Sequence, residues 1–294
     1  MSFSSKKAAV YICLACVIAI ILTSVDIILM LRGYDWDVHY FSREYSLPAT
    51  ILHITTAVSV VLVISAFTVL KNNKLSSVQN KPDQFTAFFS LMTGFLMSAF
   101  GLYRLYEALS GSYIFRIKYN VWGFIAAPLA ILGGIYFIIT SVSKEPLKRK
   151  NTIFIYFFIA FLALMVFDTY FSIDTPLNSP PRIIGMIALL SAMNYMLYEV
   201  RFLLGSPMPS RYIASAGAAL ILCSMSFIPL SVFSFIGKMK ITSDTLLYLA
   251  GLTFTFYVAG KTLAYIKIKA VGNTKPAEEN NEDKQSSIQN NQNA

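Results

Sequence analysis

Residues 8–31 read AAVYICLACVIAIILTSVDIILML, a run in which Asp26 is the only charged side chain. A helix needs about 20 apolar residues to cross ~30 Å of hydrocarbon, so this run is long enough to span a bilayer. Seven further runs are also long and apolar enough to span a bilayer, and together they leave almost no room for a soluble domain. They cover residues 49–70, 85–109, 119–142, 152–171, 183–204, 212–236 and 245–268. The sequence therefore predicts an all-α, polytopic integral membrane protein, with residues 1–270 forming one bundle of eight transmembrane helices.

Composition leads to the same class by a separate route. Hydrophobic residues make up 56% of the chain and charged residues 13%, and the mean hydropathy is +0.60. The charged share is about half of that in soluble domains. The net charge of +9 falls mainly in short segments beside apolar runs, where a positive-inside bias accounts for it. We expect the lipid bilayer to be the main partner, and no nucleic acid.

The distribution of Lys and Arg predicts the orientation. With Arg104 and Lys261 set aside, 15 of these residues fall on the side shared by the two termini and 7 on the other side. The segment 144–150, with four basic residues, contributes most to this bias. Basic residues favour the cytoplasm, so both termini are predicted to be cytoplasmic. The expected location is the cell membrane, as a multi-pass protein of a bacterial cytoplasmic membrane, with residues 271–294 forming a disordered polar cytoplasmic tail.

Ionisable side chains inside the apolar runs are the strongest functional lead, because a charge in hydrocarbon is costly unless it faces a partner or water. One group lies at one depth, near the outer boundary, and is expected to converge on a polar cavity open to the outside. The alternative is a network that only fixes helix packing. This group comprises Asp26, His53, Arg104, Glu107 and Asp168.

A second polar group lies nearer the cytoplasmic side, where Asn194 and Glu199 occupy the sixth run. A pair between Glu199 and Lys261 of the eighth run would place opposite charges at a cytoplasmic gate. All seven residues, from Asp26 to Glu199, are candidate binding residues.

The first outer loop carries Asp35, Asp37 and His39 at alternating positions. In an extended segment these side chains would point the same way and could bind Zn or Mn, although acidic loops beside membranes are common. The chain lacks H-E-x-x-H, G-x-S-x-G, G-x-x-x-x-G-K-[ST] and G-x-G-x-x-G. We therefore assign no catalytic residue, no metal site and no cofactor.

Small residues and prolines predict how the helices pack. Gly94, Ser98 and Gly101 recur about one turn apart, which lets a neighbouring helix approach closely. Pro128 and Pro229 lie inside the fourth and seventh runs and are expected to kink them.

Three functions are consistent with these features. The leading hypothesis is a small-molecule permease-like or substrate-binding membrane protein with an outward-facing polar cavity. The alternatives are a membrane sensor or assembly subunit without transport activity, and an outward-facing membrane enzyme. A small-molecule ligand and a membrane-protein partner or second copy of the chain are both compatible with the sequence.

Overall fold

A computed structural model describes residues 3–69, 83–109, 121–143, 152–172, 175–239 and 242–272. This part of the chain contains eight helices that are long and apolar enough to cross a membrane. Their bounds are α1 (Phe3–Gly33), α2 (Arg43–Val69), α3 (Gln84–Leu109), α5 (Val121–Val142), α6 (Thr152–Phe171), α7 (Pro180–Leu203), α8 (Pro209–Phe235) and α9 (Ser243–Gly272). The predicted all-α bundle of eight transmembrane helices is confirmed.

Several helices begin earlier than the hydropathy runs. α2 starts at Arg43 rather than at residue 49, since the carbonyl of Ser42 accepts hydrogen bonds from the N–H groups of Tyr45 and Ser46. α7 and α9 likewise start before residues 183 and 245. The basic segment 144–150 and the predicted tail beyond residue 272 lie outside the described residues.

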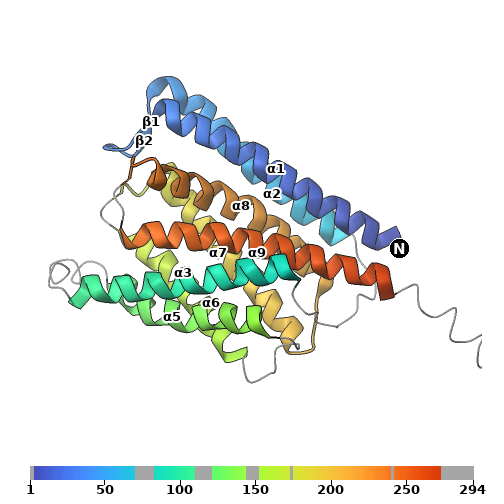
Figure 1. Cartoon of the computed structure of the whole chain (residues 1–294). Coiled ribbons are helices and arrows are strands. Elements are labelled where there is room, and N and C mark those ends of the chain that lie inside the picture. Colours follow the sequence, from blue (N-terminus) through green and yellow to red (C-terminus); the bar gives the residue numbers. More distant parts are fainter. Residues whose placement is uncertain are drawn as a thin grey trace, which may run out of the picture.

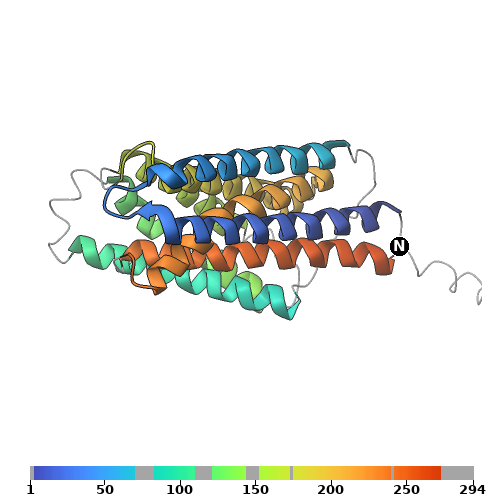
Figure 2. The same cartoon turned by 90° about the horizontal axis from the view of Figure 1, so that it is seen from above.

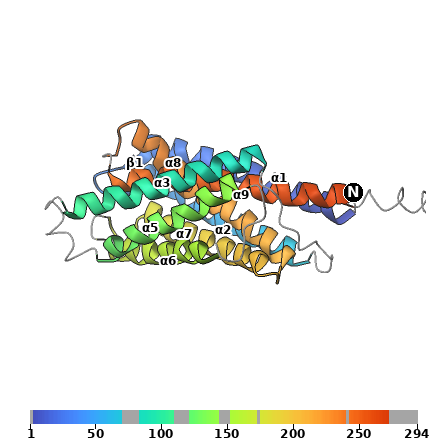
Figure 3. The same cartoon turned by 60° about the horizontal axis from the view of Figure 1, so that its bottom comes forward.

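Six of the helices close into a ring. Each of α3, α5, α6, α7, α8 and α9 packs against the next, and α9 returns to pack against α3. α1 and α2 lie outside this ring as an antiparallel pair against α8 (Figure 1, Figure 2). Figure 3 shows α5 and α6 on the face turned away from α1. α8 is the most enclosed helix, with 83% of its spanning window buried, because it packs on both the ring and the α1–α2 pair.

The two ends of the bundle differ. At one, here called the hairpin end, the chain passes from α1 to α2 through a short antiparallel hairpin of β1 (Tyr34–Asp35) and β2 (Tyr40–Phe41). At the other, here called the terminal end, α1 begins and α9 finishes (Figure 1).

The hairpin corrects the expectation of an extended loop. Asp35 accepts hydrogen bonds through Oδ1 from the N–H groups of Asp37 (2.9 Å) and Val38 (3.3 Å), which folds residues 36–39 into a turn. His39 has a φ of 61° at the end of this turn. Among the described residues no three His, Cys, Asp or Glu side chains gather as a metal-binding group. The turn separates the three side chains that an extended strand would have aligned.

Glycines set the distance between α3 and α5. A Cβ added to Gly94 would lie 2.7 Å from the carbonyl oxygen of Gly134, and one on Gly101 would lie 2.5 Å from that of Ala127. A Cβ on Gly134 would lie 2.6 Å from Oγ of Ser98. The predicted close approach through the small residues of α3 is confirmed.

We expect Gly134→Ala to lower the free energy of unfolding by about 1–3 kcal/mol, because the added methyl must push two backbones apart. The matched control is Gly185→Ala in α7, where the added Cβ would meet its nearest neighbour, Ser226 Oγ, at an ordinary 3.7 Å. Thermal unfolding in detergent checks both variants. Equal midpoints for the two would show that the glycines do not set this packing.

Aromatic side chains fill the ring between its two ends. Phe100, Phe137, Phe158, Phe161 and Phe254 are all at most 3% exposed and come from α3, α5, α6 and α9. Their rings form successive contacts, with centroids 5.8 Å apart for Phe100 and Phe161 and 4.8 Å apart for Phe137 and Phe158. This layer is apolar and closely packed, so it separates the polar groups at one end from those at the other.

Candidate functional site

Arg104 of α3 organises the polar groups at the hairpin end. Its Nη2 lies 2.9 Å from Oδ2 of Asp168 on α6, and both side chains are 7% exposed. Its Nη1 donates to Ser243 Oγ at 3.0 Å and to Asp244 Oδ1 at 3.3 Å, both at the start of α9. Ser243 in turn donates to Glu107 Oε2 at 3.0 Å. Three of the candidate residues, Arg104, Glu107 and Asp168, are thus brought together, and their contacts tie α3, α6 and α9.

A cavity of about 300 Å³ adjoins this cluster. Carboxylates of Glu107, Asp168 and Asp244 line it, together with two guanidinium groups, those of Arg104 and Arg182. Hydroxyl groups make up much of the remaining polar wall. They belong to Thr169, Ser172, Thr175, Ser179, Ser226, Thr242 and Ser243. The volume is at the lower end of the range for small-molecule sites, about 300–1,000 Å³.

The β1–β2 hairpin covers part of this cavity, to which it contributes Tyr34, Trp36 and His39. The Trp36 ring packs on Phe233 of α8 with 4.9 Å between centroids, and it meets Tyr34 edge-on at 4.8 Å. Burial raises the pKa of the Tyr34 phenol above its usual value, with smaller contributions from nearby acidic groups. Tyr34 therefore keeps its proton at neutral pH and presents a neutral hydroxyl.

Arg182 was not among the predicted site residues, because its position before the sixth apolar run placed it in an outer loop. The structure includes it in the first turn of α7, where it is 6% exposed and lines the cavity. Its Nη1 and Nη2 donate to the backbone carbonyls of Thr175 and Tyr170. Within the described residues it contacts no carboxylate within 4.0 Å, and its Nε has no hydrogen-bond partner. The positive charge of Arg182 is therefore available to a ligand in the cavity.

Asp26 and His53 lie elsewhere, which corrects the expectation of a single shared cavity. They line a second pocket of about 10 Å³, roughly the space of one water molecule. The two pockets share Pro181, Ser226 and Leu230 as walls. The physical reason is that α1 and α2 pack outside the ring, so their side chains reach the gap beside α8 rather than the interior of the ring.

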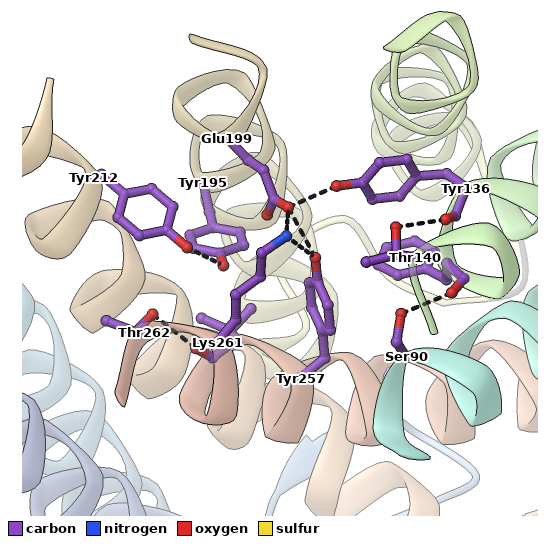
Figure 4. Close-up of polar contacts among 11 residues, drawn as sticks. Ser90, Tyr136, Thr140, Tyr195, Glu199, Tyr212, Tyr257, Lys261 and Thr262 are labelled. Carbon is purple, nitrogen blue, oxygen red and sulfur yellow. Dashed lines mark hydrogen bonds and ion pairs between the residues drawn. The ribbon is translucent and has the colours of Figure 1, made fainter. Parts of the chain in front are cut away.

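Glu199 and Lys261 form an ion pair at the terminal end (Figure 4). Glu199 Oε1 also accepts hydrogen bonds from the hydroxyls of Tyr136 (2.6 Å) and Tyr257 (2.9 Å). Lys261 donates to the Tyr257 hydroxyl at 2.8 Å. The sequence-based suggestion that Glu199 meets Lys261 is confirmed, and the contacts join α5, α7 and α9.

Tyrosines that sequence reasoning did not select complete this second cluster. Tyr195 of α7 and Tyr212 of α8 share a hydrogen bond of 2.8 Å between their hydroxyls (Figure 4). Tyr136, Tyr195 and Tyr257 are fully buried. Asn194, in contrast, is exposed on α7, outside both clusters.

Comparison of the chain with known protein families, with curated protein sequences and with solved structures finds no match. The two polar clusters differ in what they can bind. The hairpin-end cluster has room for a ligand and groups of both charges to bind it, whereas the terminal-end cluster is closed by its own contacts.

Proposed function

We propose that this integral membrane protein is a small-molecule permease that binds a small polar solute in the cavity at the hairpin end. The observation that carries the proposal is a cavity of about 300 Å³ lined by two arginines and three carboxylates. Charged groups inside transmembrane helices are costly, and they commonly mark substrate pathways where they face a cavity.

The available charge of Arg182 indicates the chemistry of the solute. Arg104 is already engaged by Asp168 and Asp244, whereas the Nη atoms of Arg182 contact only backbone carbonyls within the described residues. A guanidinium recognises carboxylates through paired hydrogen bonds. We propose a solute with a carboxylate group, its remaining polar atoms meeting the hydroxyl and carboxylate wall.

The orientation is part of the proposal. The excess of basic residues on the side of both termini supports a cytoplasmic terminal end. The cavity then faces the outside, and the Glu199–Lys261 pair lies on the cytoplasmic side of the aromatic layer.

A thermal-shift screen of small carboxylates in detergent tests the binding step. A ligand that binds only the folded protein stabilises it by about 2.7 kcal/mol at roughly 100 times its Kd. We expect at least one carboxylate to raise the Tm of the wild type and Arg182→Gln to abolish that rise. The matched control is Arg201→Gln at the far end of the same helix, where Arg201 is exposed and contacts Met208.

Either of two results would contradict the proposal. A panel of carboxylates that leaves the wild-type Tm unchanged would count against a binding site. A full ligand shift in Arg182→Gln would show that this guanidinium does not bind the solute. In either case the contacts that tie α3, α6 and α9 favour the sensor or assembly alternative, in which the polar layer fixes helix packing.

A further inference from the structure

We propose that Glu199 is a proton-binding site, and that its protonation is linked to the separation of α7 from α9 at the terminal end. This inference rests on the proposed function only for the role of the proton site, which is to couple proton uptake to solute movement. The proton site itself stands on the geometry of the cluster in Figure 4.

The two oxygens of the Glu199 carboxylate are used unequally. All three donors, from Tyr136, Tyr257 and Lys261, converge on Oε1. Oε2 is buried and has no hydrogen-bond partner among the described residues. A buried, unpartnered carboxylate oxygen is unfavourable as an anion, and it is the position at which a proton can be added without displacing a donor.

The ion pair is also unequal in its access to water. The Lys261 side chain is 24% exposed and that of Glu199 is 2% exposed. A lysine can extend its ammonium group to water on its long aliphatic stem, whereas the shorter side chain of Glu199 remains buried. When the pair separates, Lys261 becomes hydrated and the carboxylate stays in a medium of low dielectric.

An ionised carboxylate left in that position raises the free energy of the protein. Removing one partner of a buried ion pair is strongly destabilising, chiefly because the other charge is left uncompensated. Protonation removes this cost by neutralising Glu199. Opening of this end therefore favours proton uptake and, by linkage, proton uptake favours opening.

The groups that face Glu199 offer no substitute cation. α5 contributes Tyr136, α8 contributes Tyr212, and α7 itself contributes Tyr195. α9 contributes Tyr257 and Lys261. On α6, Tyr156 is exposed and does not enter the cluster. Lys261 is thus the one cation within 4.0 Å of Glu199 in the described part of the chain.

Protonation of Glu199 is a proton transfer alone. A proton from hydronium forms an O–H bond at Oε2 and leaves water, so the cluster gains one positive charge and nothing is oxidised or reduced. The protonated acid keeps Oε1 as an acceptor for the tyrosine hydroxyls but attracts Lys261 less strongly. The Lys261 contact between α7 and α9 weakens, while the hydrogen bonds from Tyr136 and Tyr257 to Oε1 remain.

Infrared difference spectroscopy of the full chain in lipid nanodiscs tests the proton site without any solute. Acidifying the sample should produce the carbonyl band of a protonated carboxylic acid, and Glu199→Gln should remove that component. Asp26→Asn, which alters a buried carboxylate outside the ring, should retain it. An unchanged band in Glu199→Gln would overturn the proposal.

Alkylation of a buried thiol tests the linked opening. Thr262 is 0% exposed beside Lys261, so Thr262→Cys in a background lacking Cys13, Cys16 and Cys223 should react slowly with an aqueous reagent. At alkaline pH, adding Glu199→Gln should speed the reaction about tenfold or more, because the amide resembles the neutral acid. Equal rates with and without Glu199→Gln would overturn the link to opening.

Lys261→Met keeps the proposal testable if Glu199→Gln does not fold. Without the ammonium, Glu199 has no compensating cation, so the carboxylic acid band should already be present at alkaline pH. Its absence at every pH would show that Glu199 does not bind a proton. Because no solute enters these measurements, their failure is distinct from a failure of the thermal-shift screen.

Discussion

Asp168→Leu should lower the free energy of unfolding by about 3–5 kcal/mol, because it leaves the guanidinium of Arg104 buried without its closest carboxylate. Arg104 Nη2 and Asp168 Oδ2 are 2.9 Å apart, and both side chains are 7% exposed. Asp244, also in contact with Arg104, is 45% exposed and its charge is screened by water, so it compensates only in part.

The double variant Arg104→Met with Asp168→Leu should recover most of this loss. Replacing a buried ion pair by apolar residues of similar volume is often neutral, since the cost of desolvating both charges disappears. A double-mutant cycle from chemical unfolding in detergent gives the coupling energy between the two residues. Arg201→Met is the control for removing an exposed arginine, and it should change stability by no more than about 0.5 kcal/mol.

A loss below about 1 kcal/mol for Asp168→Leu would mean that cavity water, rather than Asp168, compensates the guanidinium. A double variant as unstable as the single one would mean that Arg104 is needed for packing by its stem. The Arg104 guanidinium also lies 5.9 Å from the centre of the Phe100 ring, which is part of the aromatic layer.

Hydropathy was sufficient to predict the eight membrane-spanning helices. The eight runs became eight helices, since apolar runs of that length can satisfy their backbone groups in lipid only as helices. The depth of Arg104 and Asp168 also followed from counting residues along their helices. Every helix of a bundle crosses the same depths, however, so the depth of a residue does not determine which side chains it faces.

Asp26 and His53 show this limit. Their depth was the same as that of Arg104, but they belong to the pair of helices outside the ring, and only the packing of α1 and α2 on α8 determines that. The other site residues were missed because α7 and α9 begin before the apolar runs do. Arg182 and Ser243 were placed in loops because the prolines and polar residues that begin α7 and α9 lower the local hydropathy.

One sequence signal for the terminal-end cluster was overlooked. Tyr195 precedes Glu199 by four residues, and Tyr257 precedes Lys261 by four, so each tyrosine shares a helix face with its charged neighbour. The repeated spacing on two helices indicated polar faces that could meet. Which tyrosine contacts which charge depends on helix rotation, and the sequence does not contain that information directly.

Water access to the hairpin-end cavity distinguishes a solute site from a dry packing layer. Ser226 of α8 lines the cavity, is 3% exposed and has no partner for Oγ among the described residues. Ser224, two residues earlier on the same helix, is 5% exposed and lines neither the large nor the small pocket. The two serines are therefore matched in burial and differ in their relation to the cavity.

The decisive measurement is the labelling of Ser226→Cys and Ser224→Cys, each in a background lacking Cys13, Cys16 and Cys223, in intact cells with a membrane-impermeant thiol reagent. A thiol reacts only where water and reagent reach it. We expect Ser226→Cys to be labelled from outside and Ser224→Cys to remain unlabelled. Labelling of neither would contradict a water-filled cavity, and labelling of Ser226→Cys only in inverted vesicles would contradict its outward orientation.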